Sequence, residues 1–519
     1  MNSLTLKRVF HFWPWWLLLV LSIWLHFAGL GERSFHHDES IHAKLSYDMA
    51  QGGGYHYNPT YHGPLLYMLT ALDFRILPDN DFTARLPIAL CGISLVLLAF
   101  FLRRPLGVRA AWWTGLLFTI SPTMLFFGRF LRMDLLELTT ASFAFLAAWR
   151  AFRGSFVAWG WLGFFSGLAF ATKENAYVTV AITGMAAAFV AFDRGPLRSF
   201  QEGLALIRRE WAGILLAVGI FLLVTIPLYT VGLSHPEDWA FPVKAISYWW
   251  QQHSIKRVPG PWWFYIPRLV EYEFLVLTAA AVWIFRRGRR LLSLELFLFF
   301  FGLSSIVMYI YLGEKVPWLL VHQSWAFIPL AGCQLARSFG PQGRWWSRSL
   351  AGLGLALTIL VSFSANFLLQ EMDPQRDRVS SLHFVQTTPE FLRVAREGLI
   401  ATKVPGETTI YAAGESVWPL NWYWRHQKVS WTRPTGPVEA GLVICNPEDE
   451  QTVATALGAA WESEIVPLRS WWLMYVGEPS ASDWFRYMLS RRYWGEIGST
   501  EVAVFRPCSV EVPPGGPDG

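Results

Sequence analysis

Long apolar runs separated by short polar loops occupy residues 1–369. Each run is about 17 to 25 residues long, which is the length that an α-helix needs to cross the hydrocarbon core of a bilayer. The predicted spans are 12–31, 84–102, 110–128, 132–150, 156–172, 175–192, 211–232, 268–285, 292–312, 318–336 and 347–368. The pattern predicts a polytopic α-helical membrane protein, with about eleven transmembrane helices in a domain over residues 1–369.

Basic residues mark one side of this threading. Cytoplasmic loops of membrane proteins are enriched in lysine and arginine. If Lys7 and Arg8 are cytoplasmic, every second loop that follows is rich in arginine, with Arg103, Arg104, Arg109, Arg150, Arg153, Arg194, Arg198, Arg208, Arg209, Arg286, Arg287, Arg289, Arg290, Arg337, Arg344 and Arg348. We therefore expect a multi-pass protein of the cytoplasmic membrane, with a cytoplasmic N-terminus and an extracytoplasmic C-terminal domain. No small-x-small cleavage site precedes Glu32, so the first run is predicted to be an uncleaved span.

The first outer loop, residues 32–83, carries two helical patterns. One runs from Asp38 to Gln51 and is stopped by three consecutive glycines. The other, Pro64–Leu77, is short and is interrupted by Asp73 and Arg75. It is predicted to be an interfacial helix that lies on the membrane surface. An additional span there would move every following arginine-rich loop to the outer side, against the observed distribution of basic residues.

Residues 370–519 differ in character, because the long apolar runs end and charge increases. Strand patterns are expected at Thr408–Ala413, Gly441–Cys445, Trp471–Val476 and Val502–Phe505, and helical patterns at Pro389–Ala401, Glu450–Trp461 and Ala481–Arg492. Such alternation predicts a small extracytoplasmic α/β domain. It contains no Gly-rich phosphate fingerprint, so no nucleotide is expected there. Cys445 and Cys508 could pair in an oxidising compartment, but their spacing does not decide it.

Composition narrows the class further. The chain of 519 residues is 53% hydrophobic and contains 29 Trp, which is more apolar than a typical soluble domain. The formal net charge of +5 arises in the loops between spans, so topology explains it and no nucleic-acid partner is expected. The lipid bilayer is the predicted environment.

Four polar sets fall on the outer face of this threading, and each combines acidic with basic or imidazole groups. They are Asp38 and Glu39 with His36, His37 and His42; Arg129, Arg132 and Asp134; Lys173 and Glu174; and Glu314 and Lys315 with His322. Ionisable residues close to a bilayer are functional candidates, because a charge there is costly. Transfer of a group from a lipid-linked phosphate needs cations or a metal for the leaving phosphate and a base for the acceptor.

Each set also has a structural interpretation. Asp38 and Glu39 could cap a helix and oppose its dipole. The Arg132–Asp134 and Lys173–Glu174 sets could be ion pairs that fix tight turns. His36 and His37 could ligate a metal, although adjacent histidines do not easily bind one ion. The occurrence of all four sets on one face favours a shared site over four separate structural roles.

The motifs resemble those of the GT-C superfamily of integral-membrane glycosyltransferases, near the protein mannosyltransferases and the aminoarabinose transferases. Within the superfamily they resemble the flippase activity-associated proteins of archaeal-type N-glycosylation clusters. The similar segments are His37–Ala43, His62–Tyr67, Thr83–Pro87, Arg129–Asp134, Thr172–Asn175, Glu314–Leu319 and Trp418–Tyr423. They extend over essentially the whole chain.

This resemblance implies a polyprenyl-phosphate sugar donor and inverting transfer to a protein, lipid or glycan acceptor outside the membrane. It makes Asp38 the catalytic acid of the first loop, which we expect to act as a base with support from Glu39, and it makes Asp134 the second acid. Arg129, Arg132, Lys173 and Lys315 are candidates for the donor phosphate, and Glu174, Glu314 and His322 are further polar site residues. A divalent cation is left open.

Two rival functions remain. A lipid-linked oligosaccharide flippase, or its accessory, should carry polar residues deep inside its spans. The predicted spans carry few charges, which favours chemistry at one surface. A scaffold whose outer domain recruits acceptors is the third alternative, and the intact acidic motifs argue against it.

Overall fold

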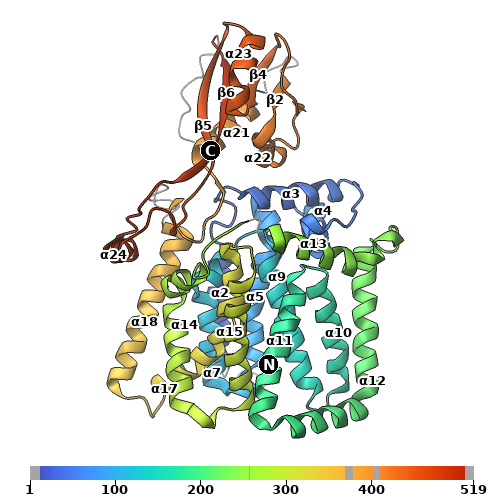
Figure 1. The fold of residues 1–519 in the computed structure, drawn as a ribbon, viewed down its shortest axis with the longest axis vertical. Coiled ribbons are helices and arrows are strands. Elements are labelled where there is room, and N and C mark those ends of the chain that lie inside the picture. The colour runs from blue at the N-terminus through green and yellow to red at the C-terminus, as the bar shows by residue number, and fades with distance from the viewer. Residues whose placement is uncertain (1–11, 256–257, 369–377, 402–408, 509–519) are drawn as a thin grey trace, which may run out of the picture. The chain divides into compact units, whose positions relative to one another are not determined.

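The computed structural model describes residues 12–255, 258–368, 378–401 and 409–508. The chain divides into two compact units (Figure 1). The helical unit comprises Met1–Glu32 and Ser46–Asp373, and the C-terminal unit comprises Arg33–Leu45 and Pro374–Gly519. The boundary near residue 45 falls inside helix α3 (His37–Ala50).

The helical unit is built from helices of unequal length. They are α2 (Trp13–Phe27), α4 (Leu65–Ile76), α5 (Asp81–Phe101), α6 (Arg103–Leu106), α7 (Val108–Ile120), α8 (Pro122–Phe127), α9 (Met133–Ala151), α10 (Phe156–Phe170), α11 (Asn175–Arg194), α12 (Pro196–Tyr229), α13 (Phe241–Ile255), α14 (Tyr265–Arg287), α15 (Ser293–Tyr311), α16 (Leu320–Ser324), α17 (Phe327–Ser338) and α18 (Trp345–Phe363). Short 3₁₀ turns are η1 (Pro59–Tyr61), η2 (Pro236–Ala240), η3 (Gly288–Arg290) and η4 (Pro317–Leu319), and a π-helical turn, η5 (Ser364–Leu368), follows α18.

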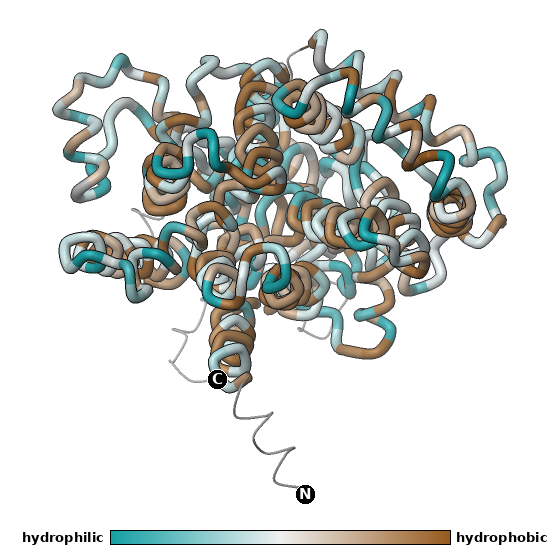
Figure 2. Tube along the Cα trace, turned by 90° about the horizontal axis from the view of Figure 1, so that it is seen from below, coloured by the Kyte–Doolittle hydropathy of each residue, from teal (hydrophilic) through white to brown (hydrophobic). Residues whose placement is uncertain are grey.

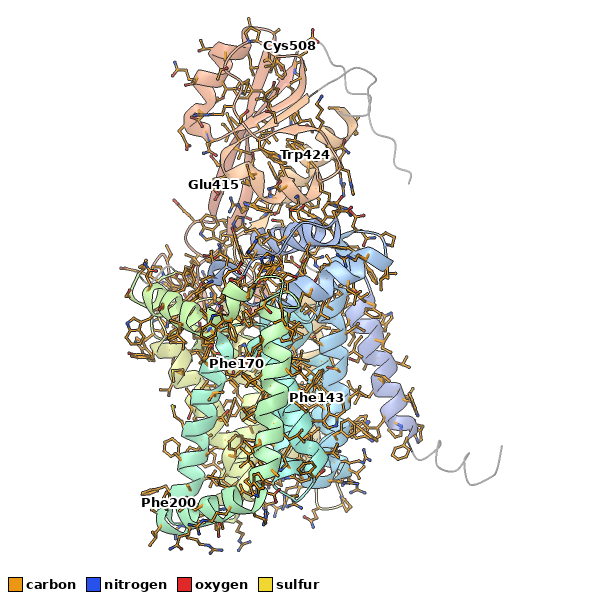
Figure 3. The ribbon with its side chains drawn as sticks, turned by 90° about the vertical axis from the view of Figure 1, so that its right-hand side faces the viewer. Phe143, Phe170, Phe200, Glu415, Trp424 and Cys508 are labelled. Atoms are coloured by element: carbon orange, nitrogen blue, oxygen red, sulfur yellow. The ribbon has the colours of Figure 1, made fainter. Side chains whose placement is uncertain are left out.

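Five helices in the described residues are long and apolar enough to cross a membrane: α5, α11, α12, α15 and α18 with η5. The shorter helices α2 and α10 are also apolar. Seen from below, brown hydrophobic segments recur along the helix tubes among white and teal ones (Figure 2). Phe143 and Phe170, labelled in Figure 3, pack against Phe165 and Phe221 of neighbouring helices. The unit is that of a multi-span membrane protein, and the number of eleven spans stays a prediction.

Two predicted spans are wrong as single helices. The run 110–128 is broken at Ser121, whose hydroxyl caps α8 by accepting from Met124 N at 3.2 Å. The run 318–336 is broken between α16 and α17. Pro329 explains this break, because proline has no N–H and its ring opposes the carbonyl four residues earlier, at Trp325. Each of these two predicted spans is therefore divided into two shorter helices, α7 with α8 and α16 with α17.

The helix predicted over Pro64–Leu77 is present as α4, and its interfacial position stays a prediction. Helix α4 has 12 residues, which at 1.5 Å per residue makes it too short to span. Gly63, immediately before it, donates its N–H to Thr172 O at 3.1 Å. A Cβ at Gly63 would stand 2.3 Å from Ala171 O, so only glycine allows this close approach. The start of α4 is thereby fixed against the turn between α10 and α11.

The C-terminal unit contains a mixed six-stranded sheet in the order β1-β5-β6-β4-β2-β3. The strands are β1 (Gln386–Thr387), β2 (Thr409–Ala412), β3 (Val429–Ser430), β4 (Ala440–Cys445), β5 (Trp461–Trp471) and β6 (Gly498–Pro507). The helices are α21 (Pro389–Ala401), α22 (Val417–Tyr423), α23 (Glu450–Leu457) and α24 (Ala481–Ser490), with 3₁₀ turns η6 (Gly414–Ser416) and η7 (Pro447–Asp449). Strand β2 runs parallel to β3 and β4, whereas β6 is antiparallel to β4 and β5.

Alternation along the strands divides the core of this unit. Leu442 and Ile444 of β4 face a cluster with α21 and α22, whereas Val443 and Cys445 face α23. This follows from the two-residue period of a strand, and both faces are covered because both sets are apolar. Glu415 and Trp424, labelled in Figure 3, lie in this unit.

The predicted α/β character of residues 370–519 is therefore present, but one strand was misplaced. Residues 472–476 lie after β5, and the strand itself is Trp461–Trp471. Its first half carries exposed Glu462, Ser463 and Glu464, which concealed the strand pattern. The helix expected to reach Trp461 ends instead at Gly458, whose φ of +83° stops it. All four cysteines are free, so Cys445 and Cys508 do not pair.

A buried tryptophan tests the core of the C-terminal unit. Trp424 is 1% exposed, and its indole N–H donates to Ala395 O at 2.7 Å. We expect Trp424→Ala to lower the free energy of unfolding by about 3 to 5 kcal/mol, because it leaves a cavity and removes the indole hydrogen bond. The change is measured by thermal unfolding of the purified protein, with proteolytic cleavage within this unit as the readout. Trp431→Ala is the control, because Trp431 is 37% exposed and should shift stability by no more than about 0.5 kcal/mol. Equal effects would contradict the assignment.

Candidate functional site

A buried carboxylate organises the polar end of the helical unit. Asp134, in the first turn of α9, is 1% exposed. Its Oδ1 lies 2.7 Å from Lys173 Nζ and its Oδ2 lies 3.4 Å from Arg132 Nε. His322 Nε2 is 3.7 Å from Oδ1. Because it lies at the N-terminus of α9, the carboxylate is also stabilised by the positive end of the helix dipole. Three cationic or imidazole groups from separate segments therefore converge on one buried anion.

The turns of the chain position these groups. Arg132 is the N-cap residue of α9, directly before Asp134 in the tight turn after α8. Its guanidinium also stacks over the Trp318 ring, with Cζ 3.7 Å from the ring centroid. Lys173 lies in the short turn between α10 and α11, and His322 lies on α16. Two of the polar sets predicted from the sequence, those of Asp134 and Lys173, thus meet, together with His322 and Trp318 of a third.

Glu137 extends this network and was not predicted. Its Oε2 lies 3.5 Å from His322 Nδ1, and its Oε1 accepts from Thr179 Oγ1 at 3.0 Å. Glu137 is fully buried, one turn after Asp134 on the same face of α9. The spacing of three residues was the available signal, because positions i and i+3 share a helix face. The two ring nitrogens of His322 thus face Asp134 and Glu137.

A second cluster adjoins the first through the chain itself. Glu174 follows Lys173, and its Oε2 lies 2.7 Å from His62 Nδ1. Tyr57 donates its hydroxyl to Glu174 Oε1 at 3.2 Å, and its backbone N–H donates to Asp238 Oδ2 at 3.1 Å. The His62–Tyr67 and Thr172–Asn175 motifs are therefore in contact.

Opposing effects set the pKa of Glu174, which lies in the turn between α10 and α11. Burial would raise it, but the charge and hydrogen bond of His62, and the nearby Lys173, lower the pKa below its ordinary value of 4.5. Glu174 is therefore an anion in the folded protein at neutral pH. Burial, followed by the charge of Glu174, raises the pKa of Tyr57, which keeps that phenol protonated as a donor.

The remaining predicted basic residues hold backbone carbonyls. Arg129 donates from Nη1 to Leu25 O at 2.7 Å and from Nη2 to Gly29 O at 3.2 Å. Lys315 donates from Nζ to carbonyls at the end of α15, including Tyr309 O at 3.0 Å and Leu312 O. Cations at helix C-termini stabilise the exposed carbonyls and the dipole. Glu314 is exposed beside Lys315. A role for Arg129 and Lys315 at a donor phosphate stays a prediction.

Asp38 and Glu39 lie in the C-terminal unit, on the first turn of α3. Glu39 is buried, and its Oε2 accepts from His36 N at 3.0 Å. This is the capping geometry that the sequence left as an alternative for this pair. Asp38 donates its backbone N–H to His36 Nδ1 at 3.0 Å. Glu39 therefore fixes the turn that presents Asp38.

The segment before α3 is held by the sheet of this unit. Ser34 Oγ donates to Thr387 O at 2.9 Å, and His36 forms an isolated antiparallel bridge with Gln386 of β1. The Phe35 ring packs 5.5 Å from the Trp422 ring, in the Trp418–Tyr423 motif. Arg469, which is paired with Glu415, donates to His37 Nδ1 at 3.0 Å. The backbone that carries Asp38 is thus anchored by residues 350 and more positions later.

One group within the described residues could hold a metal ion. It consists of His56, His235 and Glu237, whose ligand atoms all lie within 4.8 Å of one another. His235 Nδ1 is 3.3 Å from Glu237 Oε1, and His56 Nδ1 is 4.0 Å from it. Two imidazoles and a carboxylate are a donor set that transition metals accept. None of the three is a predicted site residue, and His36 and His37 do not form such a group.

A further buried acid occurs within a helix. Glu273 lies at a kink of α14, and its Oε1 accepts from Ser121 Oγ and Thr123 Oγ1, each at 2.5 Å. With Glu137, it shows that the helices contain more buried acidic side chains than the sequence pattern suggested.

Comparisons with known proteins agree with this architecture. Residues 61–227 match the family model described as dolichyl-phosphate-mannose-protein mannosyltransferase. Two undecaprenyl phosphate-α-4-amino-4-deoxy-L-arabinose arabinosyl transferases of Pseudomonas fluorescens are 27% identical over 299 residues and 26% over 255. These alignments cover 52% and 45% of this chain. The chain spans about half the length of the first relative (51%) and 40% of the second.

The fold matches solved structures over nearly the whole chain. ArnT from Cupriavidus metallidurans bound to undecaprenyl phosphate superposes with a TM-score of 0.60, at 17% identity, over 96% of this chain and 98% of that one. The apo structure of the same protein gives 0.60 at 16% identity, over 99% and 100%. Together with the family match, this confirms the resemblance to the GT-C superfamily of membrane glycosyltransferases.

Removing the lysine beside Asp134 tests the first cluster. We expect Lys173→Met to destabilise the protein by about 3 to 5 kcal/mol, because it leaves a buried carboxylate without its nearest cation. Adding Asp134→Asn should restore much of this loss, which a double-mutant cycle on thermal unfolding would measure. Arg198→Met is the control, because the Arg198–Glu202 pair is exposed and contributes about 0.3 to 0.5 kcal/mol. Additive losses at Lys173 and Asp134 would refute the coupling.

The lowered pKa of Glu174 predicts a pH dependence. A carboxyl with a depressed pKa in the folded state contributes stability above its unfolded pKa, and this stability is lost as the pH falls through the folded value. The difference in unfolding free energy between wild type and Glu174→Gln should therefore be full at neutral pH and shrink below about pH 4.3. Parallel unfolding curves at several pH values measure it. A difference that grows on acidification would contradict the lowered pKa.

Proposed function

We propose that this protein is a membrane glycosyltransferase that uses a polyprenyl-phosphate-linked sugar as donor. The observation that carries the proposal is the buried Asp134 cluster, with its lysine, arginine and histidine, at one end of an ArnT-like helical unit. Cations at the membrane surface suit a phosphate on an embedded lipid tail. The known arabinosyl transferases and the ArnT structure bound to undecaprenyl phosphate support this donor class.

Transfer requires a base for the acceptor and stabilisation of the departing phosphate. Asp38 is the proposed base, presented by the turn that Glu39 caps. It takes the acceptor's proton as the acceptor oxygen attacks the sugar's anomeric carbon, and the polyprenyl phosphate leaves with the bonding electrons. A single displacement of this kind inverts the anomeric centre. Lys173 and Arg132 are the proposed partners of the phosphate, with Arg129 and Lys315 as further candidates.

The second acid holds the cations in place before donor binds. Asp134 pairs with both Lys173 and Arg132. A donor phosphate near this end would compete with Asp134 for these cations. The extracytoplasmic orientation of this end belongs to the same proposal and rests on the arginines at the other end of the helices.

The catalytic role of Asp38 is tested by substitution. We expect Asp38→Asn to reduce sugar transfer by about 100- to 10,000-fold, because an amide cannot accept the acceptor's proton. The assay uses proteoliposomes with a panel of radiolabelled polyprenyl-phosphate sugars, and it counts label on water-stable acceptors. Glu202→Gln, an exposed carboxyl neutralised far from the acidic motifs, is the control and should retain wild-type activity.

The same assay separates the alternatives. Unchanged transfer by Asp38→Asn would remove this residue from the mechanism. Label that only changes leaflet, equally in both proteins, would favour a lipid-linked oligosaccharide flippase. Unfolding of the variant would be detected by its thermal stability, which should remain that of wild type.

A further inference from the structure

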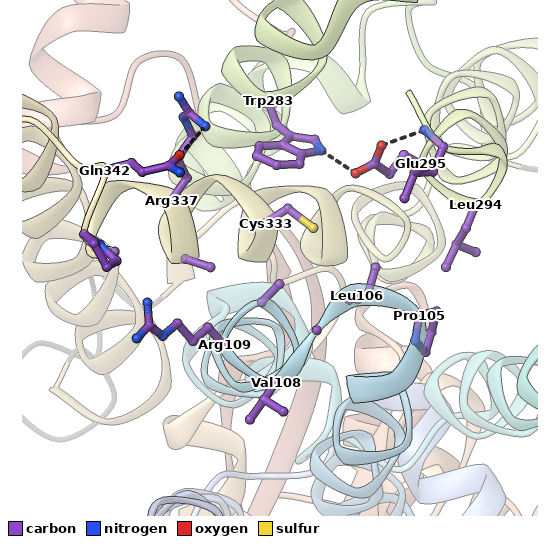
Figure 4. A pocket seen from close by; sticks show the side chains of 16 residues that line it. Pro105, Leu106, Val108, Arg109, Trp283, Leu294, Glu295, Cys333, Arg337 and Gln342 are labelled. Atoms are coloured by element: carbon purple, nitrogen blue, oxygen red, sulfur yellow. Dashed lines mark hydrogen bonds between the residues drawn. The ribbon is translucent and has the colours of Figure 1, made fainter. Parts of the chain in front are cut away.

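A pocket opens at the end of the helical unit remote from Asp134. It lies where α6 and α7 begin, beside the last turns of α14 and α17 and the first turn of α15, and it has a volume of about 540 Å³ (Figure 4). Helix α7 starts here at Val108 and leads through α8 toward the Asp134 turn, so the helices separate the two sites. The polar clusters described above contribute no residue to it.

The mouth of the pocket is cationic. Arg109 and Arg337 both line it and are both exposed (Figure 4). Between them lies the Gly340–Gln342 turn, where Arg337 Nη1 donates to Gln342 Oε1 at 3.2 Å. Arg348 Nη2 donates to Gly340 O at 3.0 Å from the other side. In the part of the chain that the structure describes, neither Arg109 nor Arg337 forms an ion pair with a carboxylate.

The acid in the pocket wall is already satisfied. Glu295 accepts from Trp283 Nε1 at 3.1 Å and from Leu292 N at 2.8 Å, as Figure 4 shows. Its Oε2 also lies 3.3 Å from Arg287 Nη2, which neutralises it. The free positive charge at the mouth therefore has no competing anion in the wall, and an anionic ligand would be attracted.

The pocket wall below the mouth is mainly apolar and includes Leu106, Val108 and Leu294. A second, smaller cavity of about 60 Å³ adjoins it and shares Pro105, Leu106 and Leu294. A cationic mouth above an apolar wall is suited to an amphiphile with an anionic head, and not to a small hydrophilic anion. Basic pockets between membrane helices commonly hold lipid headgroups in this way.

We propose that this pocket binds an anionic phospholipid of the leaflet on the arginine-rich side. Its phosphate pairs with Arg109 and Arg337, and the first part of one acyl chain lies in the pocket against Leu106. This site is separate from the proposed donor site, and the inference does not depend on the transferase activity. The bound lipid would join α7, α14, α15 and α17, which otherwise meet here around a void, and so would stabilise the bundle.

Lipid retention by the purified full-length protein tests the proposal. Native mass spectrometry would compare phosphatidylglycerol with phosphatidylcholine of the same chains, for wild type and for Arg109→Gln/Arg337→Gln. We expect wild type to retain phosphatidylglycerol preferentially. The double variant should bind it roughly 30-fold more weakly, because each arginine near a membrane surface contributes roughly a 5-fold gain in affinity for an anionic lipid. Thermal stabilisation by added phosphatidylglycerol should fall in parallel.

The matched control is Arg208→Gln/Arg344→Gln, which removes two exposed arginines from the same end of the unit but none from the pocket. It should retain phosphatidylglycerol as wild type does. Equal losses in both double variants would overturn the pocket in favour of diffuse charge attraction. Equal retention of phosphatidylcholine, or displacement of the lipid by millimolar inorganic phosphate, would overturn the anionic-lipid assignment.

Discussion

The burial of the Asp134 carboxylate is the constraint on which the polar end of the helical unit depends. Removing a carboxylate from water costs several kcal/mol unless opposite charge and hydrogen bonds replace the solvent. Lys173, Arg132 and His322 provide this replacement. They come from the turn after α8, the turn between α10 and α11, and α16, so those segments must meet for the protein to fold. Three of the motifs recognised in the sequence, Arg129–Asp134, Thr172–Asn175 and Glu314–Leu319, meet around this anion and its partners.

The same arrangement connects stability with the proposed chemistry. The groups that stabilise Asp134 are cations that a phosphate would also attract. Lys173 is followed directly by Glu174, whose contact with His62 fixes the turn. A substrate phosphate would therefore enter a site where these cations already have a partner, and it would be bound by exchange of partners. Such sites discriminate strongly, because each polar group that loses its partner without a replacement carries a cost.

The sequence predicted where most of the long helices lie, because apolar length defines them, but α12, expected over 211–232, begins earlier, at Pro196. Helices α9, α10 and α11 begin within a few residues of the predicted spans. It failed where backbone chemistry interrupts an apolar run, as at Ser121 and Pro329, because window hydropathy does not register a missing N–H or a local cap.

In the site, local pairs were predictable and distant ones were not. The Arg132–Asp134 pair is two residues apart, whereas the Asp134–Lys173 contact joins residues 39 positions apart. Glu137 was missed because its spacing of three residues from Asp134, which puts both acids on one face of α9, was not considered. Strand β5 was misplaced because its first half faces solvent with polar side chains.

The segment before α3 can be anchored only after the C-terminal part of the chain has been synthesised. Ser34 and its partner Thr387 are 353 residues apart. At ribosomal rates of about 5 to 20 residues per second, roughly 20 to 70 seconds pass between their syntheses. During that interval the turn carrying Asp38 lacks its sheet partner, while most of the helices are already made. The proposed catalytic turn is therefore among the last parts of the molecule to be completed, so an interrupted chain would insert in the membrane without acquiring it.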